Sequence, residues 1–428
     1  MTEFASGWPV KRLTEVFQTQ LGKMLSVKAR AGFNPKPYLR NANVQWGRAD
    51  LSSIYFMDFT ENEQRKYALK PGDLLMCEGG EIGRTCIWRG ELPECYFQKA
   101  IHRLRPRSRD VEPEFYLYWM EWAFRIANIY GVTGTQTTIA HLPQEKLEEL
   151  DVPVPSISEQ RAIAQAFQSV QEAKEARQRE LALEHERKAA LMEHLFTHGT
   201  RGGATKNTAV GEIPKSWHLT TLGELCKDGL GTIQTGPFGS QLHASDYIEE
   251  GVPVVNPTHL GFNCIETSRV PKISKELADS LSKHYLLTGD ILISRRGDFS
   301  RYAFVGADEA GWLCGTGCML IRLANSVIDN YFLALSMSLG STQDYLEQSA
   351  VGSIMPNLNT TILSQMPVLV PAIEEQHQIA EVLRASETKV RALETELPLV
   401  EEVFDALLAE LMNGHLSIEP IFARQEAQ

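Results

Sequence analysis

Residues 159–198 read EQRAIAQAFQSVQEAKEARQRELALEHERKAALMEHLFTH, a pattern that predicts one long helix. A second copy, EQHQIAEVLRASETKVRALETELPLVEEVFDALLAELM, occupies residues 375–412 at an offset of 216 residues. Each copy follows an apolar segment bounded by proline, Val152–Pro155 or Val368–Pro371, which predicts a short strand. A helix of roughly 38 residues is about 57 Å long at about 1.5 Å per residue, so each copy needs a long partner to lie on.

The second copy has the apolar spacing of a coiled coil. Nine of ten positions in a strict 4-3 series are apolar: Ile379, Leu383, Ser386, Val390, Leu393, Leu397, Val400, Phe404, Leu407 and Leu411. The matching positions of the first copy are apolar at both ends and polar in the middle, at Lys174, Arg177, Glu184 and Lys188. A linker returns the chain between the copies, so we expect the two helices to form an antiparallel coiled coil. Pro398 predicts a bend in the second helix, without a break.

Shorter landmarks repeat in the same order outside the helices. A W-x(4)-L motif begins at Trp8 and again at Trp217. Further along, Gly72-Asp73-Leu74-Leu75 corresponds to Gly289-Asp290-Ile291-Leu292, Gly80–Arg84 corresponds to Gly297–Arg301, and Arg103-Leu104 corresponds to Arg322-Leu323. The residues between these landmarks mostly differ. The sequence therefore predicts one scaffold used twice with different contents, related by a pseudo-twofold internal repeat.

The two halves have an α+β pattern rich in short strands. We expect strands at residues 38–45, 73–77, 85–88, 101–105, 252–256, 290–294 and 319–323, and helices at 112–129 and 327–339. Glycine and small polar residues make the segment that ends at Pro214 the clearest linker. The expected organisation is a first globular domain, a long helix, a linker, a second globular domain, a second long helix and a tail, at residues 1–158, 159–199, 200–214, 215–372, 373–414 and 415–428.

Composition places the chain among ordinary globular proteins. Its 428 residues are 43% hydrophobic and 22% charged, and no apolar run reaches the length of a membrane span. The beginning of the chain does not resemble a signal peptide, so we expect a cytoplasmic protein without membrane contact. Seven cysteines form no C-x-x-C pair, which favours buried reduced thiols and no metal site.

The net charge of −12 argues at first sight against a nucleic-acid partner. Its distribution is uneven, because residues 373–428 carry 4 Lys and Arg against 12 Asp and Glu, whereas residues 1–158 carry 20 against 19. The acidity therefore belongs mainly to the second helix and the tail. The globular halves remain free to present local basic faces.

These landmarks together resemble the specificity subunit of type I restriction-modification systems, over nearly the whole chain. The likeness rests on the doubled W-x(4)-L, G-D-[LI]-L and P-x-x-x-E-Q motifs, the last at Pro155–Gln160 and Pro371–Gln376. The first half resembles one recurrent type of target-recognition domain through Gly22–Leu25, Pro37–Val44 and Cys77–Arg84, and the more divergent second half has Gly236–Ser240 at the equivalent turn.

The resemblance implies a function and a set of partners. Each globular half is a target-recognition domain that reads one part of a bipartite site in double-stranded DNA. The helices set the spacer and dock two modification subunits. S-adenosylmethionine belongs to those modification subunits, ATP and magnesium are expected on partner subunits including the separate restriction or motor subunits, and this chain binds no cofactor of its own.

Catalytic motifs are absent from the sequence. It contains no phosphate-binding loop, no G-x-G-x-x-G, no H-E-x-x-H and no [DN]-P-P-[YF] methyltransferase motif, and Asp73 with Glu78 lacks the lysine of a metal-dependent nuclease. We therefore expect no catalytic and no metal-binding residues. Two alternatives remain: a stand-alone methyltransferase or nuclease component, and a coiled-coil adaptor with two protein-binding heads.

DNA readout requires cations for phosphates and Arg, Lys, Asn or Gln for base edges. In the first half the candidates are Lys23, Lys28, Arg30, Arg40, Asn41, Asn43, Gln45, Arg84, Arg103, Arg105 and Gln136, and in the second half they are Asn256, Arg295, Arg296, Arg301 and Asn357. Asn41, Asn43 and Gln45 share one parity of the expected strand and either read adenine or satisfy turns.

Other candidates have equally open interpretations. The alternating Arg103, Arg105, Arg107 and Arg109 form either a solvated strand edge or a phosphate track. Residues 134–138 and 352–357 are either loops that approach DNA or simple turns. His102, His141 and His185 form no recognisable ligand set, so we interpret them as structural.

Overall fold

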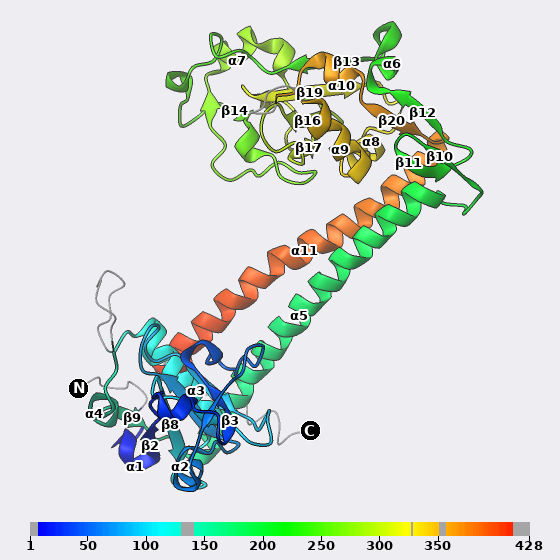
Figure 1. Cartoon of the computed structure of the whole chain (residues 1–428). Helices are drawn as coiled ribbons and strands as arrows, with labels where there is room; N and C mark the ends of the chain where they lie inside the picture. The colour runs from blue at the N-terminus through cyan, green and yellow to red at the C-terminus, as the bar shows by residue number, and fades with distance from the viewer. Residues whose placement is uncertain (1–6, 130–140, 327, 351–356, 414–428) are drawn as a thin grey trace, which may run out of the picture. The chain divides into compact units, whose positions relative to one another are not determined.

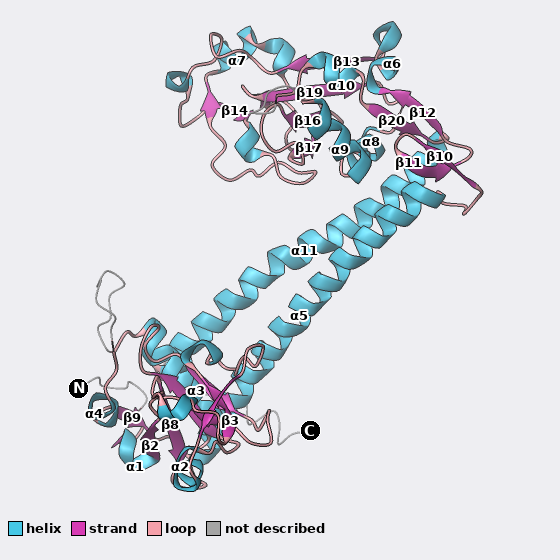
Figure 2. Cartoon of the chain, viewed as in Figure 1, coloured by secondary structure: helices cyan, strands magenta, loops and turns pink. Residues whose placement is uncertain are grey.

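The computed structural model describes residues 7–129, 141–326, 328–350 and 357–413 (Figure 1). The chain divides into two compact units. Unit 1 comprises Met1–Glu180 together with Leu393–Gln428, and unit 2 comprises Leu181–Ala392. Each unit contains one globular half and a part of each long helix (Figure 2).

Unit 1 is built on a four-stranded antiparallel sheet with the order β2-β8-β5-β6, formed by Phe17–Leu21, Ile101–Pro106, Asp73–Cys77 and Thr85–Trp88. A three-stranded sheet has the order β4-β3-β7, from Tyr55–Asp58, Pro35–Leu39 and Tyr96–Phe97. The pair β1–β9, Val10–Arg12 with Asp151–Pro153, joins the start of the domain to the strand before the first long helix. The buried helix α3, Pro113–Glu121, packs in the main core beside Phe17 and Leu104.

Unit 2 has the same three sheets in the same order. Its four-stranded sheet is β13-β19-β16-β17, from Gly231–Thr235, Cys318–Leu323, Ile291–Ser294 and Tyr302–Phe304. The three-stranded sheet is β15-β14-β18, from Lys272–Ile273, Val252–Val255 and Leu313–Cys314, and the closing pair is β12–β20, His218–Thr221 with Pro367–Val370. Helix α8, Asn330–Ser336, takes the place of α3. The internal repeat predicted from the landmarks is therefore a repeat of topology.

The shorter elements complete the two units. In unit 1 they are the helices α1, α2 and α4, at Leu13–Val16, Glu61–Tyr67 and Gln144–Glu148, and the 3-10 turns η1 and η2, at Lys28–Arg30 and Asn41–Asn43. In unit 2 they are α6, α7, α9 and α10, at Leu222–Leu225, Lys275–Ser280, Gly340–Ser349 and Thr360–Ser364, and η4 to η7, at Lys227–Gly229, Ala244–Asp246, Pro257–His259 and Ser282–His284.

The repeated G-D-[LI]-L motif is a turn locked by a buried ion pair. Gly72 and Gly289 have φ values of 90° and 94°, a region that favours glycine. The aspartate that follows accepts a hydrogen bond from the backbone three residues earlier, at 2.8 Å for Asp73 and 2.7 Å for Asp290. Each carboxylate also receives two guanidinium hydrogen bonds of 2.6–2.7 Å, to Asp73 from Arg105 and to Asp290 from Arg322.

This pairing corrects one predicted correspondence. Arg322 is equivalent to Arg105 and not to Arg103, because both Asp–Arg pairs span 32 residues and join equivalent strands. The match of Arg103-Leu104 with Arg322-Leu323 was wrong. The aspartate that pairs with the arginine identifies the equivalent position, and the leucine that follows the arginine does not.

The repeated Glu-Gln at the start of each long helix also has a structural reason. The Gln160 side chain is buried, accepts a hydrogen bond from the backbone N–H of Glu112 at 2.8 Å and donates one to the Pro155 carbonyl at 2.9 Å. Gln376 repeats both bonds in unit 2, with the N–H of Asp329 at 2.7 Å and the Pro371 carbonyl at 2.9 Å. One buried amide thus attaches the first turn of each long helix to its own domain.

The two long helices, α5 (Ile157–His198) and α11 (Ile373–Met412), pack on each other in both units. In unit 1, Ile163 and Phe167 of α5 lie in one hydrophobic cluster with Leu408 and Leu411 of α11. In unit 2, the cluster contains Leu195 and Phe196 of α5 with Ile379 and Leu383 of α11. In each unit, therefore, the helix segments run antiparallel.

Ion pairs with the second helix account for three of the four polar positions of the first helix. Lys174 pairs with Glu401 at 2.7 Å and Arg177 with Glu396 at 2.9 Å in unit 1, and Lys188 pairs with Glu387 at 2.7 Å in unit 2. The second helix continues through Pro398 from Ile373 to Met412, so the expectation that this proline does not break it is confirmed.

Most expected strands are confirmed, and three assignments need correction. The strand expected at residues 38–45 is β3, which ends at Leu39, and Asn41–Asn43 form a 3-10 turn because the Asn43 side chain caps the Arg40 N–H at 2.8 Å. The predicted linker contains the hairpin β10–β11, Thr205–Thr208 with Gly211–Pro214. The helix expected at residues 112–129 is α3 followed by a π-helical segment, Trp122–Ile126.

We predict that Asp290→Ala destabilises unit 2 by about 3 kcal/mol, because it removes the carboxylate that Arg322 and the Leu287 N–H share and leaves a partly buried guanidinium unpaired. Hydrogen exchange of the full chain, read for β16 and β19, would show the loss of protection. The control is Glu224→Ala, which removes an exposed pair with Lys227 in the same unit and should change little. Equal protection in both variants would contradict this role of Asp290.

Candidate nucleic-acid interface

In each unit, loops from several strands meet at one end of the sheets. We call this the loop cluster; in unit 1 it comprises the turns at residues 22–25, 40–45, 78–84 and 98–100, and in unit 2 those at 236–240, 256–259, 295–301 and 315–317. Backbone hydrogen bonds of 2.8–3.0 Å join these turns: Gly22 to Ile101, Gln98 to Leu39 and Glu78 to Ala100, and equivalently Gly236 to Cys318, Gly315 to Val255 and Arg295 to Gly317. Loops that a rigid scaffold holds together in this way commonly carry function.

Arg84 and Asn41 are brought together in the unit 1 cluster. One Arg84 guanidinium nitrogen donates to the Asn41 carbonyl at 3.2 Å, and another pairs with Glu81 at 2.9 Å. The Asn41 amide donates to the Gly79 carbonyl at 2.6 Å. These two predicted residues therefore form one polar corner, although part of their capacity for hydrogen bonds is already used.

Arg40, the neighbour of Asn41 in sequence, stacks on an aromatic ring. Its guanidinium carbon is 3.6 Å from the centroid of the exposed Tyr55 ring, and it donates to Ser53 at 2.8 Å. Asn43 is buried and donates to the carbonyls of Asp50 and Ser53, while Gln45 donates to the Ala42 carbonyl. The last two amides thus satisfy turns, which was the structural alternative of the sequence analysis.

The basic cluster expected from Lys23, Lys28, Arg30 and Arg40 is divided by the fold, with Arg40 on the turn described above. Lys23 is mostly covered, pairs with Glu63 at 2.7 Å and lies 4.8 Å from the centroid of the Phe59 ring. Lys28 and Arg30 are exposed on the 3-10 turn η1. Of the other three cations, the two on η1 are the ones that can meet a phosphate.

Arg103 and Arg105 share one face of β8, as their alternation predicts, but residues 66–68 cover that face. Arg103 is buried and donates to the carbonyls of Lys66 and Ala68, and Arg105 is held by Asp73. These two side chains are part of the domain's internal packing. The neighbouring His102 is buried against the Leu142 carbonyl, and burial lowers its pKa, so the ring is neutral at pH 7.

The second unit places four of its five predicted residues around one hairpin turn. Arg295 donates to the Leu358 carbonyl at 3.3 Å, Arg296 forms a backbone bridge with Asn357, and Arg301 pairs with Asp298 at 3.4 Å. Arg296 is exposed, and within the described ranges its side chain makes no hydrogen bond or ion pair. Asn256 donates to the Tyr247 hydroxyl at 3.2 Å, on the adjacent turn. Gln136 lies outside the described residues.

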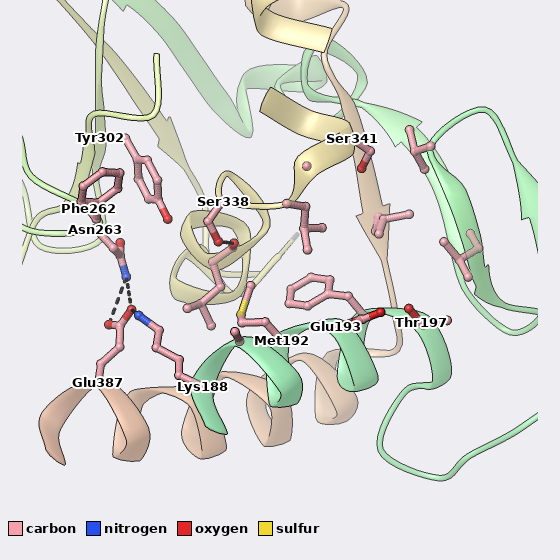
Figure 3. Close-up of a pocket in the computed structure, with 18 of the residues that line it drawn as sticks. Lys188, Met192, Glu193, Thr197, Phe262, Asn263, Tyr302, Ser338, Ser341 and Glu387 are labelled. Carbon is pink, nitrogen blue, oxygen red and sulfur yellow. Dashed lines mark hydrogen bonds and ion pairs between the residues drawn. The ribbon is translucent and has the colours of Figure 1, made fainter. Parts of the chain in front are cut away.

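A network that the sequence analysis missed attaches one turn of the unit 2 domain to the long helices (Figure 3). Glu387 of α11 is buried and accepts hydrogen bonds from Lys188 of α5, from the Asn263 amide and from the Tyr331 hydroxyl. The Arg391 guanidinium donates to the Asn263 carbonyl at 3.2 Å. The network borders a cavity of about 600 Å³ that Met192, Phe196 and Tyr302 also line.

Asn263 occupies the place that Gly47 has in unit 1. Both residues have positive φ, 59° and 79°, in turns that the same backbone hydrogen bonds close, Gly261 to Cys264 and Gln45 to Arg48. Asparagine tolerates this region and adds a side chain that reaches the helix. A pattern search would need to notice an asparagine at a glycine position and an acidic residue, Glu387, beside the apolar seam.

The thiols and the acidic residues offer no reactive centre in the part of the chain that the structure describes. Five of the seven cysteines are buried, and burial raises the pKa of Cys77 to about 11 and that of Cys314 to about 12. Across the described ranges, no group of three or more His, Cys, Asp or Glu side chains is arranged to hold a metal ion. None of the described helices combines the length and apolarity needed to cross a bilayer.

Two copies of one strand-rich domain, each followed by a long helix, define the class of two-domain specificity proteins. The chain matches the family of the type I restriction modification DNA specificity domain twice, over residues 5–185 and 214–402, and it belongs to that family.

Individual relatives agree with this assignment. The type I restriction enzyme MjaVIII specificity subunit of Methanocaldococcus jannaschii is 22% identical, with 86% of each chain covered. The EcoBI specificity subunit of Escherichia coli is 21% identical over 82% of this chain and 75% of its own. The crystal structure of a type I restriction-modification S subunit from M. genitalium shares the fold, with a TM-score of 0.60 and 16% identity over 96% of this chain and 97% of that one.

We predict that Glu387→Ala destabilises unit 2 by about 2–3 kcal/mol, since it leaves Lys188, Asn263 and Tyr331 without their common acceptor. Chemical denaturation of the full chain would measure the loss, and hydrogen exchange would place it at residues 261–265. Glu381→Ala, an exposed position on the same helix, serves as the control. Unchanged exchange in that turn would show that the network does not hold it.

Proposed function

We propose that this chain is the DNA sequence-recognition subunit of a type I restriction-modification complex. The observation that carries the proposal is the doubled domain, since each unit presents its own loop cluster on one shared topology. Each cluster reads one half of a bipartite double-stranded target. The chain itself is not catalytic; chemistry belongs to partner subunits.

Readout uses the polar residues of the two loop clusters, several of which are only partly exposed. In unit 1 they are Arg84, Arg40 and Asn41, with Lys28 and Arg30 on phosphates. In unit 2 Arg296, which is exposed, lies among Arg295, Arg301, Asn256 and Asn357. Arginine in this setting binds guanine edges or phosphate through two parallel hydrogen bonds, and asparagine pairs with adenine edges. Hydrogen bonds within the domain already occupy Lys23, Asn43, Gln45, Arg103 and Arg105, so these residues are assigned to structure and not to readout.

The two long helices act as an antiparallel coiled-coil spacer between the domains, with a pseudo-twofold relation between the halves. Such a relation suits a target with two separated parts, in the way that dimeric readers match the spacing of their half-sites. The helix segments also have an exposed apolar patch in unit 1, formed by Val170, Ala173, Leu399, Val400 and Val403. We assign this patch to the docking of modification subunits, which bind S-adenosylmethionine, while restriction or motor subunits bind ATP and magnesium.

Arg296→Ala is expected to weaken binding of the cognate duplex by about 10-fold or more, because a lost arginine contact to a base costs about 1–3 kcal/mol. Gel-shift competition with modification subunits present measures the affinity for cognate and altered duplexes. Lys227→Ala is the matched control, since this lysine pairs with Glu224 and precedes β13, whose far end leads into the cluster. No sequence preference in the wild-type complex would refute the proposed function.

Insertion of four residues into one long helix should change the permitted spacer and leave both half-sites unaltered. One added helical turn lengthens the helix by about 6 Å, which corresponds to roughly two base pairs. Selection from a duplex library with variable spacing identifies the preferred length. A library that returns the wild-type spacing would argue against the spacer function of the helices.

A further inference from the structure

The two loop clusters present a large apolar side chain at the same position. Met24 is 61% exposed and Phe238 is 59% exposed. Each lies two residues after the glycine that follows β2 or β13. The positions are equivalent, because the N–H groups of Gly22 and Gly236 donate to the equivalent carbonyls of Ile101 and Cys318. Most of the other loop residues differ between the two halves, whereas both halves have an exposed apolar residue at this position.

The glycine before each of these residues is sterically required. A Cβ atom added to Gly22 would lie 2.2 Å from the Gln98 carbonyl oxygen, and one added to Gly236 would lie 2.0 Å from the Gly315 carbonyl oxygen. The backbone that follows each strand therefore packs directly against the backbone of the neighbouring turn. This contact fixes where Met24 and Phe238 begin.

The turns that follow are held by their own hydrogen bonds. The Phe238 N–H donates to the Gln241 side chain at 3.1 Å, and the Phe238 carbonyl accepts from the Gln241 and Leu242 backbones at 2.8 and 3.3 Å. Leu242 is buried in a small core. Phe238 thus remains exposed on a turn that is fixed on both sides.

In unit 1 the equivalent loop is fixed by Asp58, whose carboxylate accepts the backbone N–H groups of Gly32, Phe33 and Asn34 at 2.7–3.0 Å. Val27 and Phe33 are almost fully exposed beside Met24. An ordered loop that keeps its apolar side chains outside its own core indicates an external partner.

Cations lie in the same loop cluster as each position, although Asp58, Glu61 and Glu63 also line the pocket beside Met24, and these cations point to the chemistry of that partner. Lys28 and Arg30 follow Met24 on η1, and the exposed Lys99 donates its backbone N–H to the Lys23 carbonyl. Near Phe238, Gly315 contacts Gly236, and Gly317 binds the Arg295 N–H beside Arg296. An exposed apolar side chain with cations nearby is suited to a duplex, whose phosphates meet the cations while the apolar group reaches the bases.

We propose that Met24 and Phe238 are wedge residues that insert at one base step in each half-site and partly unstack it. The inference rests on the proposed DNA-recognition function and adds a source of specificity to it. Unstacking costs a few kcal/mol per step, and this cost is lowest at flexible pyrimidine–purine steps. Each domain then selects a deformable step through Met24 or Phe238 without a hydrogen bond to it.

The test uses the complex of the full chain with its modification subunits and a cognate duplex that carries 2-aminopurine at successive positions of each half-site. Wild-type complex should raise the fluorescence at one step per half-site. Phe238→Ala should abolish the signal in one half and weaken binding about 10-fold, Met24→Ala should do the same in the other half, and Phe238→Leu should retain most of both effects. Phe262→Ala is the control, because Phe262 is 73% exposed in the same unit and borders the helix-side cavity.

Two outcomes would overturn the wedge assignment. One is a wild-type complex that prefers its target sequence but raises the fluorescence at no step. The other is an equal effect of Phe238→Ala and Phe262→Ala on signal and affinity. Absence of any sequence preference in the wild-type complex would instead overturn the proposed function, so the two failures are distinguishable.

Discussion

One buried amide at the base of each long helix determines whether a domain and its helix behave as a single body. Gln160 and Gln376 each join the first helical turn to a backbone N–H of their own domain and to the proline carbonyl before the helix. Water does not compete for these hydrogen bonds, because both side chains are buried. A helix can set the spacing between two DNA half-sites only if each domain is firmly attached to it. The proposed spacing function therefore depends on these two side chains as well as on the apolar seam.

The helices differ in how they are held along their length. In unit 1, charged pairs such as Lys174 with Glu401 lie near the surface and are each worth little in free energy, so the packing of Phe167 dominates. In unit 2, the buried Glu387 adds a polar connection between both helices and a turn of the domain. The two halves therefore share a topology but not a stabilising pattern.

The sequence predicted the features that a few residues encode locally. The strand at residues 73–77 is such a case, since its apolar run follows directly on the glycine turn that begins it. It failed where the partner is distant: Arg103 resembled a surface cation until residues 66–68 covered it, and Asn43 resembled a strand residue although its amide closes a turn with Asp50 and Ser53. The contact between Asn263 and Glu387 spans 124 residues, and no periodic pattern reveals it.

That last contact has a consequence for building chimaeras from this chain. A natural-looking junction lies at the start of α11, where the second globular domain ends and the helix begins. A foreign domain joined there would bring glycine or another residue to the position of Asn263, and Glu387 would keep its charge while losing a donor. A junction beyond Ala392, where unit 2 ends, transfers the domain together with the helical residues that form hydrogen bonds to it. The portable module is thus longer than the globular domain and includes the helical turns that carry Glu387 and Arg391.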